Sequence, residues 1–244
     1  QLISKKVYKN IRSLKSRKSR YAQEKFIVEG LRLIKTILND GATLEYLITT
    51  KIFRSKNIEF IKNINSEVIF EVSEKEMEDL SNMTTPSGVL ATTNFPKYDQ
   101  LNSKKNIIYL DQISDPGNMG TILRTASWFG VEQIVLSDKC IDPFNPKVVA
   151  AAMGSHFQLK FLGEENLNKL DDYIWIGASL DGGKFSHSKI LNKKWVLVMG
   201  SEAHGIDNKL KPRLDETFTI PKLGKGESLN VGVAMGIFLS KIVS

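Results

Sequence analysis

The sequence predicts an α/β protein: a C-terminal parallel sheet with helices on both faces, preceded by a small mixed α/β domain. From residue 106 onward, continuous apolar strands alternate with helical segments, the pattern of a parallel sheet covered on both faces. Residues 1–95 mix helical and strand patterns, and a polar segment without periodicity follows them. We therefore predict a first domain over residues 1–95, a linker over 96–105 and a second domain over 106–244.

The elements of the first domain follow from periodicity and turn residues. Apolar residues at helical spacing predict one helix over residues 22–41, ending at Gly41. Ser73 and Glu76 form a capping-box pattern, which predicts that the next helix begins after Ser73. Strands are predicted on either side of these helices, over residues 44–50, 67–73 and, after a turn, in the segment 84–95.

The second domain is predicted to consist almost entirely of alternating strands and helices. Its strands are expected over residues 106–111, 131–137, 156–162, 173–180, 194–200 and 216–222. Its helices are expected over 121–130, 145–154 and 165–172, with a closing helix from about Ser228. Pro116 and Gly117 are expected to turn the chain ahead of the first of these helices, which residues 118–120 open.

Positive charge is concentrated at the N-terminus. The whole chain carries a net charge of +7, yet the first 35 residues hold eleven Lys and Arg against two Glu, and the remainder is slightly acidic. Such a segment attracts the phosphates of a polyanion. The interleaved aromatic residues Tyr8, Tyr21 and Phe26 favour nucleic acid over the alternative, a solvated basic helix without a partner.

Other classes of protein are disfavoured by composition. The single cysteine, Cys140, excludes an intramolecular disulfide, and the three histidines (His156, His187 and His204) lack metal-ligand spacing. No N-terminal apolar segment indicates a signal peptide, and no run approaches the length of a membrane span. The chain is therefore expected to be cytoplasmic, without a metal and without membrane contact.

Three segments at the carboxyl ends of predicted strands carry unusual residues, and this is where open α/β sheets bind ligands. The first contains Asn118 and Arg124, the second Gly200 and Glu202, and the third is a glycine-bearing loop ahead of the closing helix. Each has an ordinary interpretation as a capped helix or a tight turn. In the third, Ser228 suits an N-cap, with Asn230 in the first helical turn. No phosphate-binding glycine pattern is present in that loop.

Taken together, the stretches NMGTILRTA, VMGSEAHGI and IPKLGKGESLNVGVAMGI resemble the three motifs of the SpoU/TrmH family of RNA 2′-O-ribose methyltransferases, within the SPOUT superfamily. The resemblance covers residues 106–244 and implies that they form the catalytic domain. It implies a trefoil knot whose loops bind S-adenosylmethionine (SAM), and a homodimer formed through the knotted domain. The first domain resembles a ribosomal-protein-like substrate-binding domain. One departure is Gly232, where the family often has serine.

The resemblance also implies which residues form the site. The cofactor would be held by the segments around Gly200, Ile220, Leu229 and, less directly, Leu180. The catalytic residues would be Arg124, Asn118, Glu202, Ser228 and Asn230. Because a guanidinium stays protonated, we expect Arg124 to clamp phosphate and stabilise the developing alkoxide, and the deprotonating group is left open.

The leading hypothesis is therefore a SAM-dependent methyltransferase acting on the ribose 2′-hydroxyl of ribosomal RNA, with guanosine as the first choice. Transfer RNA is the nearest alternative substrate, and a full N-terminal domain favours ribosomal RNA. A non-catalytic RNA-binding homologue is an alternative of a different class. A dinucleotide-dependent dehydrogenase is disfavoured, because residues 111–121 lack the glycine spacing for pyrophosphate.

Overall fold

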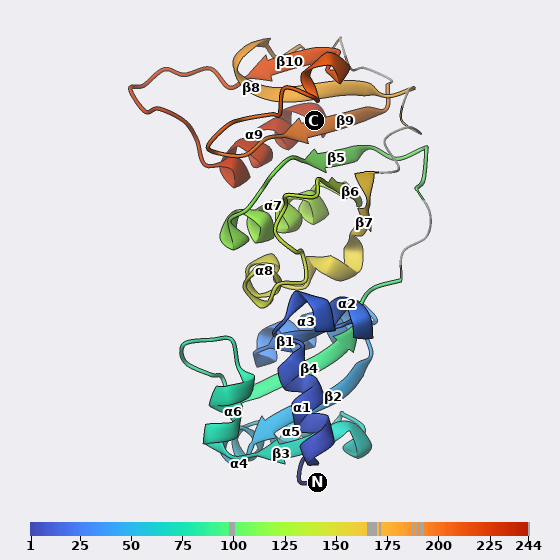
Figure 1. Cartoon of the computed structure of the whole chain (residues 1–244), viewed down its shortest axis with the longest axis vertical. Coiled ribbons are helices and arrows are strands. Elements are labelled where there is room, and N and C mark those ends of the chain that lie inside the picture. Colours follow the sequence, from blue (N-terminus) through green and yellow to red (C-terminus); the bar gives the residue numbers. More distant parts are fainter. Residues whose placement is uncertain are drawn as a thin grey trace. The chain divides into compact units, whose positions relative to one another are not determined.

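A computed structural model describes residues 1–97, 101–164, 170, 172–186, 188, 190 and 193–243 (Figure 1). The chain forms two compact units, which are described separately. The first unit comprises Gln1–Lys97 together with Asp142–Phe157, and the second comprises the rest of the chain. In the described part of the chain, no helix is long and apolar enough to span a membrane.

The first unit is built on a mixed four-stranded sheet in the order β1-β4-β2-β3. The strands β1 and β2 pair antiparallel with β4, whereas β3 pairs parallel with β2. Their bounds are Lys25–Glu29 (β1), Leu44–Thr50 (β2), Ile69–Val72 (β3) and Val89–Asn94 (β4). β3 is shorter than the predicted strand over 67–73 because a 3-10 turn, Ser66–Val68, occupies its first positions.

Seven α-helices of the described residues accompany this sheet. They are α1 (Lys5–Ser13), α2 (Arg17–Gln23), α3 (Leu31–Asn39), α4 (Lys51–Lys56), α5 (Ile58–Lys62), α6 (Glu74–Leu80) and α8 (Pro146–Ala152). The capping box predicted at α6 is confirmed, since the Ser73 hydroxyl accepts from the Glu76 amide and the Glu76 carboxylate accepts from the Ser73 amide. Ile11 and Leu14 of the basic N-terminal segment are buried in the core of this unit.

The single helix predicted over residues 22–41 is wrong. That stretch holds the end of α2, then β1, then α3, with Gly30 at a φ of +94° between strand and helix. Phe26, Ile27 and Val28 are aromatic or β-branched, and all three are buried in register with β4. Pairing with a distant strand outweighed the local helical spacing, because it buries both faces of β1.

Residues 142–157, which the sequence places among the residues of the second domain, pack in the first unit. Asp142 forms a buried ion pair with Arg20, whose Nε lies 3.0 Å from the Asp142 Oδ2. The side chain of Arg20 also donates to the carbonyl oxygens of Leu14 and Lys15, and the residue is only 2% exposed. Tyr21 donates to the same carboxylate, and burial together with Asp142 raises the pKa of Tyr21 to about 12.

Removing Arg20 should destabilise the first unit strongly. In the Arg20→Ala variant the Asp142 carboxylate stays buried without its partner, and we expect a loss of about 3–5 kcal/mol in the free energy of unfolding. The matched control is Arg12→Ala, which breaks an exposed ion pair with Asp79 and should cost less than about 1 kcal/mol. Urea denaturation followed by circular dichroism measures the free energy of unfolding of both variants. Equal losses in the two would contradict the stabilising role of the buried ion pair between Arg20 and Asp142.

The second unit confirms the predicted parallel sheet, with the strand order β10-β8-β9-β5-β6-β7 and every pairing parallel. The bounds are Ile107–Leu110 (β5), Gln133–Leu136 (β6), Lys160–Leu162 (β7), Ile174–Lys184 (β8), Trp195–Met199 (β9) and Glu216–Thr219 (β10). β7 is shorter than the strand predicted over 156–162, because residues 155–158 form a 3-10 turn. β8 continues beyond its predicted end at residue 180. The helix predicted over 165–172 lies largely outside the described residues.

Two helices of the second unit, α7 (Pro116–Trp128) and α9 (Val231–Val243), pack against each other. The prediction that Pro116 turns the chain ahead of α7 is wrong, because Pro116 is the first residue of the helix. Asp115 is the N-cap, and its carboxylate accepts from the Asn118 amide at 2.7 Å. Proline suits the first helical position, where an amide hydrogen has no partner within the helix.

Candidate functional site

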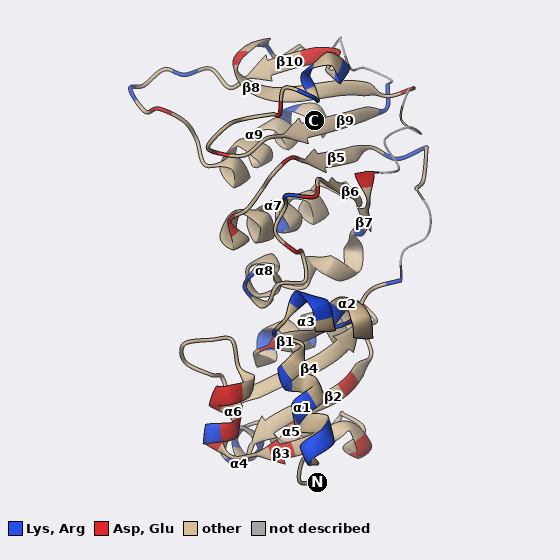
Figure 2. Cartoon of the chain, viewed as in Figure 1, with Lys and Arg blue, Asp and Glu red and all other residues tan. Residues whose placement is uncertain are grey.

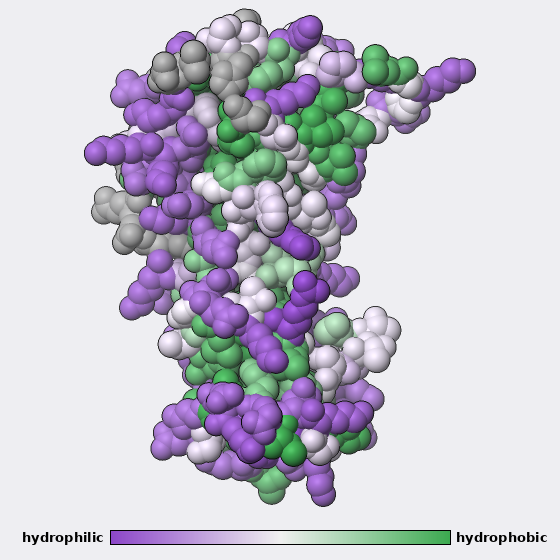
Figure 3. All heavy atoms as spheres, turned by 180° about the vertical axis from the view of Figure 1, so that it is seen from behind, coloured by the Kyte–Doolittle hydropathy of each residue, from purple (hydrophilic) through white to green (hydrophobic). Residues whose placement is uncertain are grey.

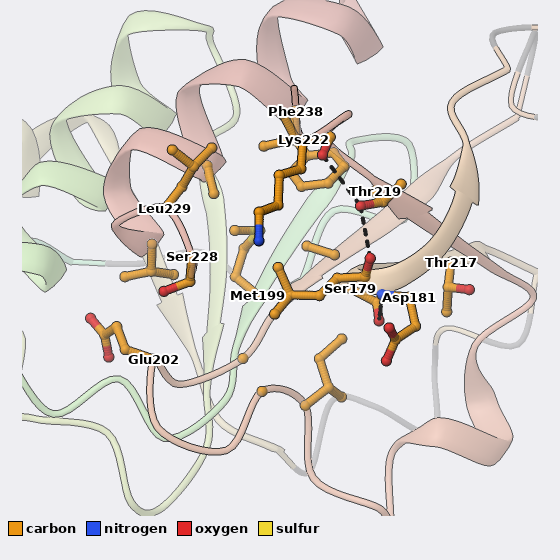
Figure 4. A pocket seen from close by; sticks show the side chains of 18 of the residues that line it. Ser179, Asp181, Met199, Glu202, Thr217, Thr219, Lys222, Ser228, Leu229 and Phe238 are labelled. Atoms are coloured by element: carbon orange, nitrogen blue, oxygen red, sulfur yellow. Dashed lines mark hydrogen bonds between the residues drawn. The ribbon is translucent and has the colours of Figure 1, made fainter. Parts of the chain in front are cut away.

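A cavity of about 930 Å³ lies at the carboxyl ends of β8, β9 and β10 in the second unit, a size typical of small-molecule sites (Figure 4). Five segments contribute to it. They are residues 178–181 within β8, residues 199–206 at and after the end of β9, the pair Lys211 and Leu214, residues 217–229 in and after β10 except Phe218 and Lys225, and several residues of α9. A pocket at the carboxyl edge of a parallel sheet is where such folds bind ligands.

The four residues predicted to bind a cofactor all line this one cavity. Leu180 reaches it from β8, Gly200 from the end of β9, Ile220 from the end of β10 and Leu229 from the loop before α9. These positions span 50 residues of sequence, and the parallel order of the three strands brings them together. The hydroxyl of Thr219 donates to the carbonyl oxygen of Leu180 at 3.1 Å, which ties the end of β10 to β8 (Figure 4).

Gly200 is required by a tight loop after β9. A Cβ added there would lie 2.2 Å from the carbonyl carbon of Gly205 and 2.4 Å from the amide nitrogen of Ile206. Ser201 and Gly205 exchange two main-chain hydrogen bonds, at 3.1 and 2.9 Å, and Gly205 has a φ of +66°. Only glycine permits this approach of two main-chain segments.

The other end of the same loop is held by the carboxylate of Asp111, the residue that directly follows β5. Asp111 is buried, and its Oδ2 accepts from the amide of Asp207 at 2.7 Å. The side chain of Gln112 donates to the Asp207 carboxylate at 3.0 Å. A hydrogen bond from the amide of Lys209 lowers the pKa of Asp207. The loop over residues 200–207 is thus fixed at both ends.

Three predicted catalytic residues form one chain of hydrogen bonds. The Asn230 amide group donates to the Asn118 Oδ1 at 2.7 Å, and the Asn118 amide group donates to the Glu202 carboxylate. Asn118 lies on α7, Glu202 in the loop after β9, and Asn230 directly before α9. Each asparagine therefore has a defined orientation, and the carboxylate of Glu202 is held in place.

The expectation that Ser228 caps the closing helix is wrong. The helix begins at Val231, and the Asn230 Oδ1 accepts from the amides of Gly232 at 2.9 Å and Val233 at 3.3 Å. Asn230 is therefore the cap, because a side-chain oxygen reaches the amides two and three residues ahead of it. Ser228 lies too far from the helix start for this role and lines the cavity instead.

Only two of the five predicted catalytic residues, Glu202 and Ser228, line the cavity. Asn118 and Asn230 lie beside it in the hydrogen-bonded chain, whereas Arg124 is exposed on α7. With the residues that the structure describes, its guanidinium forms no hydrogen bond or ion pair. A solvent-facing cation of this kind is accessible to a phosphate that arrives with a substrate.

Gly232 allows α9 to approach α7 closely. A Cβ added to Gly232 would lie 2.8 Å from the Cγ2 and 3.1 Å from the Cβ of Thr121. The glycine that departs from the usual serine therefore has a structural reason in this chain. Close packing of the two helices also keeps Asn230 within hydrogen-bonding distance of Asn118.

Sequence reasoning missed several residues that line the cavity. Among the polar ones, Ser179 and Asp181 flank Leu180 and Lys222 stands two residues after Ile220, so their closeness to residues that were singled out was an available signal. Two apolar residues of α9, Val231 and Phe238, are buried and also line the cavity.

Among the residues that the structure describes, no group of three His, Cys, Asp or Glu side chains is arranged to hold a metal ion. The fold and the cavity together define an α/β protein with a small-molecule pocket at the carboxyl edge of a parallel sheet. Comparison with known proteins identifies the class further. The family model described as the SpoU rRNA Methylase family matches residues 105–240, and a second, described as an MRM3-like substrate binding domain, matches residues 5–91.

Similar proteins extend over almost the whole chain. The 23S rRNA (guanosine(2553)-2′-O)-methyltransferase RlmP of Bacillus subtilis is 28% identical, over 95% of this chain and 93% of that protein. A putative RNA methyltransferase of the TrmH family from Porphyromonas gingivalis has a TM-score of 0.82 and 29% identity, covering 99% of this chain and 98% of that one. An AdoMet-bound rRNA methyltransferase from Sinorhizobium meliloti has a TM-score of 0.81 and 26% identity, covering 99% and 97%.

This chain belongs to the SpoU rRNA methylase family. The match confirms the resemblance carried by the three motifs, all of which lie within the matched residues 105–240.

Proposed function

We propose that this chain transfers the methyl group of SAM to a ribose 2′-hydroxyl of ribosomal RNA, with guanosine as the first choice of nucleoside. The observation that carries the proposal is the convergence of Leu180, Gly200, Ile220 and Leu229 on one cavity. Next to it lies the hydrogen-bonded chain of Asn230, Asn118 and Glu202. The printed activity of the Bacillus subtilis relative, a guanosine 2′-O-methyltransferase of 23S rRNA, supports the choice of substrate.

The residues of the cavity fit SAM. Its volume of about 930 Å³ accommodates a ligand of that size. Main-chain groups around Gly200, Ile220 and Leu229 would hold the adenine, and the buried side chains of Met199 and Phe238 give the cavity apolar surface. When bound, SAM supplies a methyl group already activated by its sulfonium.

The chain's own residues would chiefly align the ribose 2′-hydroxyl with the methyl group, because correct positioning of two reacting groups by itself accelerates a transfer reaction strongly. Arg124 would clamp an RNA phosphate and stabilise negative charge on the ribose oxygen, since a guanidinium donates and does not accept protons. Asn118 and Asn230 would orient the ribose or Arg124, and Ser228 would contact substrate or Asn230. Glu202 would hold Asn118 through the hydrogen bond described above.

We assign RNA binding to residues 1–95 and catalysis to residues 106–244. The match of residues 5–91 to a substrate-binding domain supports the first assignment. So do the exposed cations of α1 and α2, which Figure 2 shows in blue: Lys5, Lys6, Lys9, Arg17 and Lys18. Arg12 and Lys15 of the same segment are engaged by Asp79 and by main-chain carbonyl oxygens.

Removing part of this charge should weaken RNA binding and reduce its salt dependence. In the triple variant Lys5→Gln, Lys9→Gln and Lys18→Gln, we expect the slope of log affinity against log salt to fall in magnitude by about 2–3, because each phosphate contact contributes nearly one. The control removes the same charge from α4 and α5, in Lys51→Gln, Lys56→Gln and Lys62→Gln. Filter binding to ribosomal RNA at several salt concentrations measures both slopes, and identical slopes would contradict the assignment.

We further propose that the second unit is a trefoil knot and forms a homodimer. The hydrogen bonds that Asn118 makes to Asn230 and Glu202 join α7, the loop after β9 and the segment before α9, which are distant in sequence, and they support the knot. Exposed apolar side chains support the dimer: Trp128 at the end of α7 is 84% exposed, and Val233 and Val243 on α9 are 52% and 46% exposed. Hydrophobic surface gathers beside the protruding loop of this unit in Figure 3.

The cytoplasm is the compartment that we propose for this enzyme. A ribosomal RNA substrate supports it, and so does a buried free thiol at Cys140, the chain's single cysteine.

Methylation in vitro tests the function directly. Total RNA is incubated with the full chain and SAM labelled in its methyl group, and the modified ribose is then mapped. We expect label on ribosomal RNA at a 2′-oxygen. Label confined to transfer RNA would establish the alternative substrate. Absence of SAM binding in isothermal titration would instead indicate a non-catalytic RNA-binding homologue.

A further inference from the structure

Lys222 projects into the cavity from the loop that follows β10. It comes directly after Pro221, three residues beyond the end of β10 at Thr219. Figure 4 shows its amino group pointing into the cavity, toward the side where Ser228 and Leu229 lie. With the residues that the structure describes, Lys222 forms no hydrogen bond or ion pair, so its positive charge is available to a ligand.

The charges around the cavity have a distinct pattern. Two lysines, Lys211 and Lys222, and three carboxylates, Asp181, Glu202 and Glu227, line it, and Lys222 is the lysine whose amino group Figure 4 shows pointing inward. SAM carries two cationic groups, the sulfonium and the ammonium, and a single carboxylate. A lysine inside the cavity repels both cationic groups and attracts the carboxylate, and the partly apolar surroundings strengthen each effect.

We propose that Lys222 determines how this chain recognises the amino-acid end of its methyl donor, by pairing its ammonium with the donor carboxylate. The inference rests on the proposed function, because it takes SAM as the ligand of this cavity. Repulsion between Lys222 and the sulfonium would also disfavour a reversed placement of the donor. Lys222 is thus a specificity-determining residue for the donor rather than a participant in methyl transfer.

The loop that bears Lys222 can adapt to the ligand. The residues from Pro221 to Asn230 are all exposed, and Leu223 is 99% exposed. A Cβ added to Gly224 or Gly226 would meet nothing within 4 Å, so no packing contact forms at that position of either glycine. The lysine can therefore approach a carboxylate without repacking of the core.

Binding measurements on the full chain test the proposal with two ligands that differ by one group, SAM and decarboxylated SAM. We expect the wild-type chain to bind SAM about tenfold more tightly, as a charge-assisted hydrogen bond predicts. The Lys222→Met variant keeps an unbranched side chain of similar length without the charge. It should bind decarboxylated SAM like the wild type and lose the preference for SAM.

Two further variants complete the design. Lys222→Arg should recover part of the preference, because it restores the charge. Lys225→Met removes a lysine from the same loop that does not line the cavity, and it should bind both ligands like the wild type. Isothermal titration measures the affinity of the wild type and of each of the three variants for both ligands.

The outcomes separate this inference from the function on which it rests. An unchanged preference in Lys222→Met, or equal loss of affinity for both ligands, would overturn the role of Lys222 while leaving the SAM site intact. Failure of the wild-type chain to bind either ligand would overturn the proposed function, and the role of Lys222 with it.

Discussion

Replacing Arg124 with alanine should abolish methyl transfer while SAM binding persists. Arg124 is exposed on α7 and does not line the cavity, so its removal leaves the cofactor pocket unchanged. The rate should fall by about 10²–10³, the usual effect of removing a donor that stabilises a developing oxyanion. Single-turnover methylation of ribosomal RNA measures the rate, and isothermal titration measures the affinity for SAM.

The conservative variant Arg124→Lys sharpens this test. Lysine keeps the charge but lacks the planar fork that grips a phosphate through two hydrogen bonds. We expect activity between those of the wild type and Arg124→Ala. Substantial turnover by the alanine variant would refute the catalytic role of Arg124.

Gly200→Ala should have the second large effect, on the cofactor site itself. The added methyl would lie 2.2 Å from the carbonyl carbon of Gly205, which is main chain and cannot rotate away. The loop over residues 200–206 would have to move out of the cavity. We expect SAM binding to be lost and stability to fall by about 1–3 kcal/mol, as for an overpacked core.

Gly224→Ala is the matched control for this change. Gly224 also lines the cavity, yet a Cβ there meets nothing within 4 Å. The free energy of unfolding of the Gly224→Ala variant should stay within about 0.5 kcal/mol of that of the wild type. Titration with SAM and thermal unfolding compare the two variants. Normal SAM binding by Gly200→Ala would show that the cofactor lies elsewhere.

Much of the site was predictable from the sequence because its chemistry is encoded locally. Gly200 directly follows the apolar strand β9 and Ile220 directly follows β10, and such strand ends meet at one edge of any parallel sheet. Leu229 precedes an apolar helix in a glycine-bearing loop. Their motifs also carried a family resemblance. Strand ends and motifs together located the pocket without coordinates.

The parts that the sequence misplaced depend on partners far away in the chain. The residues of β1 have helical spacing, but β4, more than 60 residues later, pairs with them as a strand. Asp142 follows the β6 region in sequence, but its carboxylate is neutralised by Arg20, which lies 122 residues earlier. No local pattern reports such pairings.

By itself, the sequence determined that this protein has a parallel α/β sheet, a basic N-terminal segment and a group of candidate site residues at the strand ends, because periodicity, charge and motifs are properties of neighbouring residues. Only the tertiary structure decided that Asn230 rather than Ser228 caps α9, that Gly232 lies against Thr121, and that Lys222 points into the cavity. These outcomes are set by the distances between side chains on separate elements, which form only when the sheet assembles.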